Sequence, residues 1–139
     1  MSEVPFQLDR LDHLVLRTSD VDRLVEFYTG LGCRVVREVD TIGLVQLAAG
    51  ASMLDIVFAE DGAGERQPNL DHYALRVSPF DAEAILAFCA SRQIPAQAPD
   101  FLLLGADGYG PAVYIEDPDG NRVELKGPPE KPRPDDHAG

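Results

Sequence analysis

The distribution of apolar and polar residues predicts two similar units, each a strand followed by a helix. Residues 11–17 and 70–77 are apolar runs typical of strands. After each run the apolar residues recur at helical spacing, and Ser19 and Ser78 stand where a helix N-cap is expected. One face of each helix is therefore expected to pack on a sheet. The residues of these faces are Val21, Leu24, Val25, Tyr28 and Leu31, then Ala82, Ile85, Phe88 and Cys89.

Short β-type runs follow each predicted helix, so each unit has the pattern βαβββ. These runs are residues 34–39, 43–48, 52–58, 94–97, 112–116 and 122–126. The polar segment 60–69 is expected to link the units, and the Pro-rich residues 128–139 are expected to form a disordered tail. The glycine-rich stretch 105–110 is expected to be a flexible loop over a cleft, with 101–104 as its apolar lip.

The two units are copies of one pattern. LDHLVLRTSDVD at 11–22 and LDHYALRVSPFD at 70–81 match at seven of twelve positions with an offset of 59. The repeat places His13 and His72 at equivalent points of two modules, about residues 8–59 and 70–127, within one domain over 1–127. Sheets of about four strands cannot hide both faces alone. We therefore expect the modules to pair and to curve around a shared cleft.

His13 and His72 stand among apolar neighbours, which needs a reason. They are either buried neutral histidines held by backbone carbonyls or part of a metal site. Single acids interrupt apolar runs near the end of each module, Asp55 in the first and Glu124 in the second. Ionised groups inside a sheet are costly unless paired or metal-bound, although Glu124, between basic residues, would also suit the outward face of an edge strand. Two imidazoles with one or two carboxylates fit a divalent metal (Zn, Ni, Co, Mn or Fe) and leave positions open for substrate.

The charge of the chain excludes several classes of partner. Twelve Lys+Arg against 24 Asp+Glu give a net charge of −12, which repels nucleic-acid phosphates and anionic lipid. Neither a nucleic-acid nor a membrane partner is expected. No apolar run approaches the roughly 20 residues of a membrane span, and the first residues do not resemble a signal peptide, so a cytoplasmic protein is expected. Cys33 and Cys89 lack C-x-x-C spacing and are expected to stay reduced.

Four stretches resemble the vicinal oxygen chelate superfamily, which includes glyoxalase I, bleomycin-resistance proteins, extradiol dioxygenases and methylmalonyl-CoA epimerase. They are LDHLVLRTSDV, FYTGLGCRV, LDHYALRV and EDPDGNRVEL, and the resemblance covers about residues 8–127. The resemblance implies an α+β fold in which two paired βαβββ modules form a curved mixed sheet around a cleft. It also implies one divalent metal ion, held by His13, Asp55, His72 and Glu124 from the first and last strands of each module.

The resemblance further implies a metal-dependent lyase or isomerase of glyoxalase type. Its small substrate would chelate the metal through vicinal oxygens while a proton moves. Glu124 is the preferred general base and Asp55 the alternative. Arg17 stands where glyoxalase I binds glutathione, so it is expected to hold an anionic group of the substrate, with Arg76 in the mirrored part. The alternative for Arg17 is an ion pair with an acid such as Asp55 or Glu124.

Two other functions are compatible with the sequence. One is a non-catalytic protein that binds a small molecule, as bleomycin-resistance proteins do. The other is a ring-cleaving dioxygenase, which would use both histidines and Glu124, although His137 in the predicted tail is all that is left for its further pocket histidine. Ala59 and Pro68 stand where a glutathione site has polar groups, so a glutathione hemithioacetal is expected to be a poor substrate. Because the family often builds its cleft across two modules or two chains, we expect a homodimer.

Overall fold

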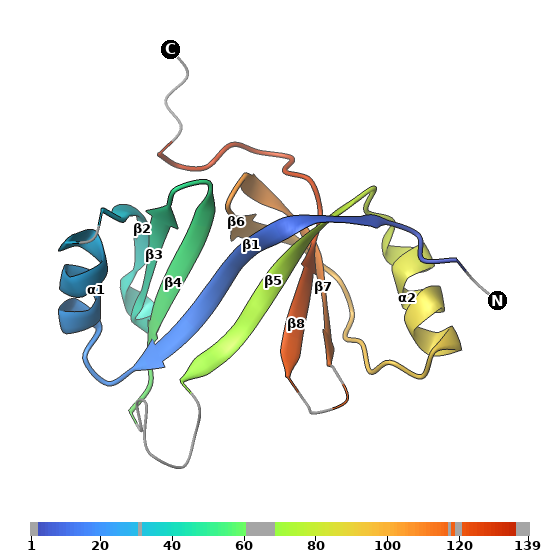
Figure 1. Ribbon diagram of the computed structural model, residues 1–139, viewed down its shortest axis with the longest axis horizontal. Coiled ribbons are helices and arrows are strands. Elements are labelled where there is room, and N and C mark those ends of the chain that lie inside the picture. The colour runs from blue at the N-terminus through green and yellow to red at the C-terminus, as the bar shows by residue number, and fades with distance from the viewer. Residues whose placement is uncertain (1–2, 31, 61–68, 117, 119–120, 136–139) are drawn as a thin grey trace.

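The computed structural model describes residues 3–30, 32–60, 69–116, 118 and 121–135, which form one eight-stranded sheet and two helices (Figure 1). The elements of the first half are β1 (Gln7–Thr18), α1 (Val21–Gly30), β2 (Arg34–Val39), a 3-10 turn (Asp40–Ile42), β3 (Leu44–Ala49) and β4 (Ser52–Phe58). Those of the second half are β5 (Leu70–Ser78), α2 (Ala82–Ser91), β6 (Asp100–Gly105), β7 (Gly108–Glu116) and β8 (Arg122–Lys126).

The strand order shows how the two modules join. Across the sheet the order is β2-β3-β4-β1-β5-β8-β7-β6. The strands β1 and β5 pair antiparallel at the centre, and each has the last strand of its own module, β4 or β8, as a parallel neighbour. The modules are thus related by an approximate two-fold axis between β1 and β5. The predicted α+β fold of two βαβββ modules in a curved mixed sheet is confirmed.

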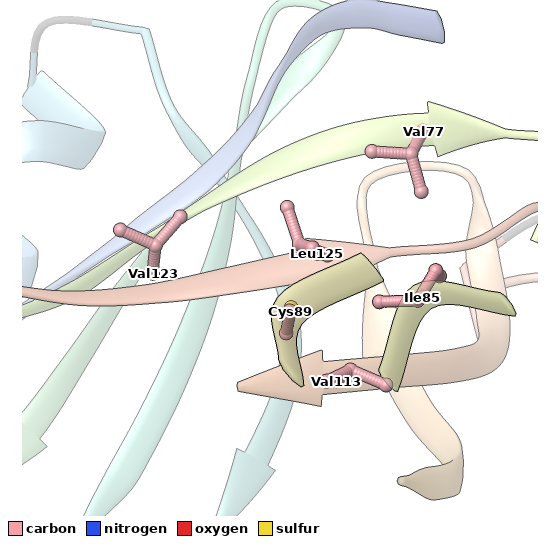
Figure 2. Packing of buried hydrophobic residues seen from close by; sticks show 6 residues of the cluster. All are labelled: Val77, Ile85, Cys89, Val113, Val123 and Leu125. Atoms are coloured by element: carbon pink, nitrogen blue, oxygen red, sulfur yellow. The ribbon is translucent and has the colours of Figure 1, made fainter. Parts of the chain in front are cut away.

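Helix α2 packs against the second module through a compact apolar cluster. Figure 2 shows Ile85 and Cys89 of α2 among side chains of β5, β7 and β8. Both side chains are buried, as the helical spacing predicts, and burying such a side chain stabilises the fold by about 1.5–3 kcal/mol. The strand residues of this cluster are Val77, Val113, Val123 and Leu125.

The predicted N-caps are wrong, because the helices begin later than expected. The Asp81 side chain accepts a hydrogen bond from the N–H of Ala84, and Asp20 accepts one from the N–H of Arg23. Aspartate ranks with serine as an N-cap residue, so the sequence allowed either. Ser78 instead ends β5, and its hydroxyl donates to Asp9.

Helix α1 lies at the opposite end of the molecule from α2 (Figure 1), and none of its described residues is buried. The predicted apolar face is half-buried rather than buried, Leu31 lies outside the described residues, and Phe27 is 59% exposed. Both helices are ten residues long. Within the described residues, no helix is long and apolar enough to cross a membrane.

The glycine-rich stretch predicted to be a flexible loop is instead part of a hairpin. Strand β6 runs to Gly105 and pairs antiparallel with β7, which starts at Gly108, so only Ala106 and Asp107 form the turn. Gly108 has a φ of +140°, and a Cβ there would overlap the carbonyl of Lys131. The glycines therefore permit a tight turn and a close approach of two backbones. The strand predicted at 94–97 is wrong too, since that segment contributes one isolated bridge from Ala96 to Ile115.

The segment after β8 lies along the β6–β7 hairpin, although disorder was expected for 128–139. The carbonyl of Lys131 accepts from the N–H of Tyr109 at 2.8 Å, and the N–H of Glu130 donates to the carbonyl of Tyr109 at 2.6 Å. Arg133 Nη1 donates to the carbonyl of Ala106 at 2.9 Å. Most of these bonds join main-chain groups, which leave no pattern in the side chains. Residues 136–139 and the predicted linker at 61–68 lie outside the described residues.

Candidate metal centre

The two repeated histidines face each other at the centre of the sheet. In the antiparallel β1–β5 pair, His13 lies opposite Ala74 and Val15 lies opposite His72. The imidazole rings meet edge to face, with centroids 5.6 Å apart. The approximate two-fold axis thus brings equivalent side chains together, as the repeat predicts.

Glu124 completes a cluster with these histidines. It lies on β8 beside Ala74 of β5, and its Oε1 is 3.2 Å from His13 Nε2 and 3.1 Å from His72 Nε2. One potential ligand atom from each residue lies within 4.8 Å of the others, and all three side chains are buried. The other oxygen, Oε2, is buried without a hydrogen-bond partner among the described residues.

Asp55 is not part of that three-residue cluster, although it lines the same pocket. It lies on β4, opposite Val15 of β1. Its Oδ2 accepts a hydrogen bond from Gln46 Nε2 at 2.9 Å, and its Oδ1 has no partner among the described residues. Three of the four predicted ligands therefore gather, and Asp55 faces the pocket beside them.

A carboxylate lies behind each imidazole, on the side away from Glu124. Asp12 Oδ2 is 2.6 Å from His13 Nδ1, and Asp71 Oδ2 is 2.7 Å from His72 Nδ1. If each Nδ1 donates to its carboxylate, each Nε2 keeps a lone pair for a metal. Sequence reasoning did not assign these aspartates a role, although the repeated Asp-His pair was the signal that identifies them.

Arg17 and Arg76 both form ion pairs, but not with the acids considered from the sequence. Arg17 Nη1 donates to Asp71 Oδ1 at 3.1 Å, so it holds the carboxylate behind His72. Arg76 pairs with Asp107 in the β6–β7 turn, which Arg10 also contacts. Neither arginine is among the described residues that line the pocket beside the cluster.

Burial and mutual contact shift the protonation of the cluster. Burial opposes the charge of His13, but its hydrogen bonds with Asp12 and Glu124 outweigh this and raise its pKa to about 10, so a metal at Nε2 would take the place of a proton. Burial also opposes the charge of Glu124, yet the two imidazoles hold its pKa well below the usual range. For Asp55, burial is the largest influence and raises the pKa to about 6. Asp55 is thus poised to gain or lose a proton near neutral pH.

The pocket above the cluster has a volume of about 340 Å³ and a mixed lining. Ile42, Leu44 and Leu103 contribute apolar surface, and Arg37 and Tyr114 contribute polar groups. Sequence reasoning missed Arg37, because an arginine in a strand with charged neighbours carries no distinguishing pattern. The expectation that 101–104 forms an apolar lip is met in part: Leu103 and Leu104 line the pocket, whereas Phe101 and Leu102 are exposed.

The donor set fits a divalent first-row metal. Two neutral imidazoles and one carboxylate are the ligands of several catalytic metal sites, in which other coordination positions stay open. The unpartnered Glu124 Oε2 is consistent with this, since a buried carboxylate oxygen without a donor is costly unless a cation approaches it. His13, His72 and Glu124 are therefore the residues that could hold a metal.

Comparison with known proteins identifies the family of the chain. A sequence model of the Glyoxalase/Bleomycin resistance protein/Dioxygenase superfamily matches residues 10–125. The chain is also similar to virulence protein STM3117 of Salmonella typhimurium (strain LT2). The two are 25% identical over 130 residues, which cover 85% of this chain and 83% of that protein.

Solved structures share the fold at lower identity. Methylmalonyl-CoA epimerase from Mycobacterium tuberculosis is 23% identical with a TM-score of 0.65, and the match covers 91% of this chain and 93% of that one. The Mn(II)-bound glyoxalase from Novosphingobium aromaticivorans is 19% identical with a TM-score of 0.71, over 96% of this chain and 43% of that one. An extradiol ring-cleaving dioxygenase from B. fuscum is 20% identical with a TM-score of 0.71, over 95% of this chain and 37% of that one.

The family match runs from β1 to β8 and so includes both modules and every residue of the cluster. The last two structures are longer proteins, of which this chain spans less than half. This chain belongs to the Glyoxalase/Bleomycin resistance protein/Dioxygenase superfamily.

Proposed function

We propose that this protein is a divalent-metal-dependent enzyme of lyase or isomerase type. Its substrate is a small molecule that chelates the metal through two adjacent oxygens. The observation that carries the proposal is the convergence of His13, His72 and Glu124 on one buried point beside a pocket. When bound there, Zn, Ni, Co, Mn or Fe would supply Lewis-acid polarisation of the substrate oxygens.

In this proposal Asp55 is the general base. Its unpartnered Oδ1 is available for a proton, and Gln46 holds the other oxygen. Its pKa of about 6 makes it ionised above pH 6 and still basic enough to accept a proton. Glu124, the preferred base from the sequence, is better suited to hold the metal because its Oε1 lies between the two imidazoles.

The ligand set and the pocket are each compatible with one other function. Two histidines and one glutamate are also the ligand set of non-haem iron oxygenases, so ring cleavage by this triad is an alternative. A protein that only binds its ligand would use the same pocket without turnover. The dioxygenase would use the same metal site, and the binding protein would use the same pocket. Neither would need Asp55 as a general base.

Proton exchange from a bound substrate separates the proposed enzyme from a protein that only binds its ligand. Chain loaded with each metal in turn is incubated in D₂O with hydroxyacetone, methylmalonyl-CoA or the glutathione hemithioacetal of methylglyoxal, and deuterium uptake is measured by mass spectrometry. We expect metal-dependent exchange in the wild type that rises with pH as Asp55 ionises, at or below the pH of about 6 that applies without a metal, because a bound cation favours the carboxylate.

Matched variants assign the base. Asp55→Asn is expected to lower exchange by about 10²- to 10⁴-fold with the metal retained, whereas Glu124→Gln is expected to lose the metal. Glu38→Gln, an exposed acid of β2, is the control and should match the wild type. Tight binding of these compounds without exchange under any metal would favour the non-catalytic alternative. Unchanged exchange in Asp55→Asn would remove Asp55 as the base.

A further inference from the structure

Arg37 brings a positive charge to the wall of the pocket. It lies on β2, is half-buried and lines the same pocket as the three candidate ligands. Its Nε donates to Gln46 Oε1 at 2.7 Å, and Gln46 in turn donates to Asp55. The guanidinium is thus fixed in place by the side chain that also orients the proposed base.

Arg37 differs from the other half-buried arginines in having no acidic partner. Among the described residues, each of the other four has a carboxylate oxygen within 4 Å, and Arg37 has none. Its contacts are Gln46, the hydroxyl of Tyr109, 3.5 Å from Nη1, and the Tyr109 ring, whose centroid is 5.8 Å from Cζ. The four paired residues are Arg10, Arg17, Arg76 and Arg133.

A half-buried guanidinium without an acidic partner among the described residues favours the binding of an anion. A half-buried cation without a counter-ion loses hydration, and the neutral groups of Gln46 and Tyr109 replace only part of it. Its Nη2 forms no hydrogen bond within the described part of the chain, and a guanidinium binds a carboxylate or phosphate through parallel N–H groups. In a chain with a net charge of −12, such a residue offsets the repulsion that an anionic substrate would otherwise meet.

We propose that Arg37 binds an anionic group of the substrate, so that the substrate is a small anion carrying a second, metal-chelating pair of oxygens. This inference rests on the proposed function and narrows its substrate class. The role expected of Arg17 from the sequence, binding the anionic group, then belongs to Arg37. Arg17 is engaged with Asp71, whereas no acid of the described residues lies beside Arg37.

Hydroxamates of increasing tail length test metal chelation and anion binding separately. Acetohydroxamate chelates a metal through two adjacent oxygens and has no charged tail. Its carboxylate-tailed homologues, with one to three methylene groups, add an anion at increasing distance, and the matching amides keep the shape without the charge. Affinities are measured by calorimetry on the zinc-loaded full chain. For at least one tail length we expect the carboxylate to bind about tenfold or more tightly than its amide.

Three variants test whether Arg37 causes this gain in affinity of the carboxylate over its amide. Arg37→Gln is expected to abolish it and to leave acetohydroxamate binding and zinc content unchanged, and Arg37→Lys should retain part of it. Arg23→Gln removes one exposed charge from α1 and controls for net charge, so it should keep the full gain. A gain that persists in Arg37→Gln, or no gain at any tail length, would overturn the proposal. If acetohydroxamate fails to bind, the chelation part of the proposed function fails, while a gain that depends on Arg37 would still stand.

Discussion

The two histidines of the cluster are equivalent in the repeat, but the carboxylates behind them are not. Asp12 is 1% exposed and also accepts a hydrogen bond from the N–H of Ala106 at 3.0 Å, in the β6–β7 turn. The side chain of Asp71 is 25% exposed and pairs with Arg17 near the surface. The His13 imidazole is therefore held by a buried carboxylate, and the His72 imidazole is held by a carboxylate in a solvent-accessible ion pair.

This difference predicts distinct outcomes for Asp12→Asn and Asp71→Asn. Both variants should weaken zinc binding by about 10- to 100-fold, because each removes the carboxylate that orients an imidazole. Asp12→Asn should also lower the melting temperature clearly, since it disturbs a buried hydrogen-bonded group. Zinc titration and thermal melts measure the two effects, with Asp9→Asn, an exposed acid of β1, as control. Zinc affinity equal to the wild type in both variants would contradict the orienting role.

Among the individual site residues, the sequence predicted those that repeat a pattern or interrupt one. His13 and His72 repeat at an offset of 59, and Glu124 interrupts an apolar run. Asp55 was predicted to be a ligand for the same reason, but only the structure shows that Gln46 occupies one of its oxygens. Arg37 could not be found, because what distinguishes it is that no acid in the described part of the chain pairs with it in three dimensions.

The β6–β7 hairpin is the element that connects the metal site to the far edge of the sheet. Its turn contacts Asp12 through Ala106, and its Asp107 pairs with Arg10 of β1. The buried Lys126 of β8 donates to the carbonyls of Leu103 and Gly110 in the same hairpin. The position of His13 thus depends on the packing of this hairpin.

Gly105→Ala tests that dependence. A Cβ at this position would lie 2.5 Å from Asp12 Oδ2 and 2.7 Å from Lys126 Cε, so these groups must shift. We expect a destabilisation of about 1–3 kcal/mol together with weaker zinc binding, measured by denaturant unfolding and zinc titration. Gly30→Ala, where nothing lies within 4 Å, is the control and should change stability little. Zinc affinity equal to the wild type in Gly105→Ala would show that the hairpin does not position Asp12.

Among the elements, the sequence predicted those with a strong internal pattern. The strands β2, β4 and β8 begin and end where the sequence predicts. The hairpin was mistaken for a loop, because its glycines are needed for a tight turn and for contact with residues 128–131, and both readings predict glycine. The helix caps were placed wrongly because serine and aspartate both occur in each candidate turn, and only geometry decides between them.

At the scale of the molecule, the repeat is what predicts both the topology and the site. An approximate two-fold axis between β1 and β5 makes the sheet continuous and brings His13 next to His72. The site therefore needs both modules, since Glu124 comes from the second and His13 from the first. No comparable pattern in the sequence predicts whether the chain forms an oligomer.

A homodimer stays a prediction. The sheet ends in the edge strands β2 and β6, and Phe101 and Leu102 of β6 are both more than half exposed. Apolar side chains at an exposed edge favour association. Sedimentation velocity at micromolar concentration should give about twice the chain mass of 15.1 kDa. A single species at the chain mass would contradict this prediction.

Metal stoichiometry is the decisive measurement for a metal site formed by His13, His72 and Glu124. Tag-free protein is dialysed with excess zinc, freed of unbound metal and analysed by plasma mass spectrometry, alongside His72→Ala, Glu124→Gln and the control Glu38→Gln. We expect about one zinc per chain in the wild type and in the control, because the three candidate ligand atoms lie within 4.8 Å of one another. We expect little or none in the two site variants. No bound zinc in the wild type, or equal zinc in all four proteins, would show that His13, His72 and Glu124 do not form a metal site.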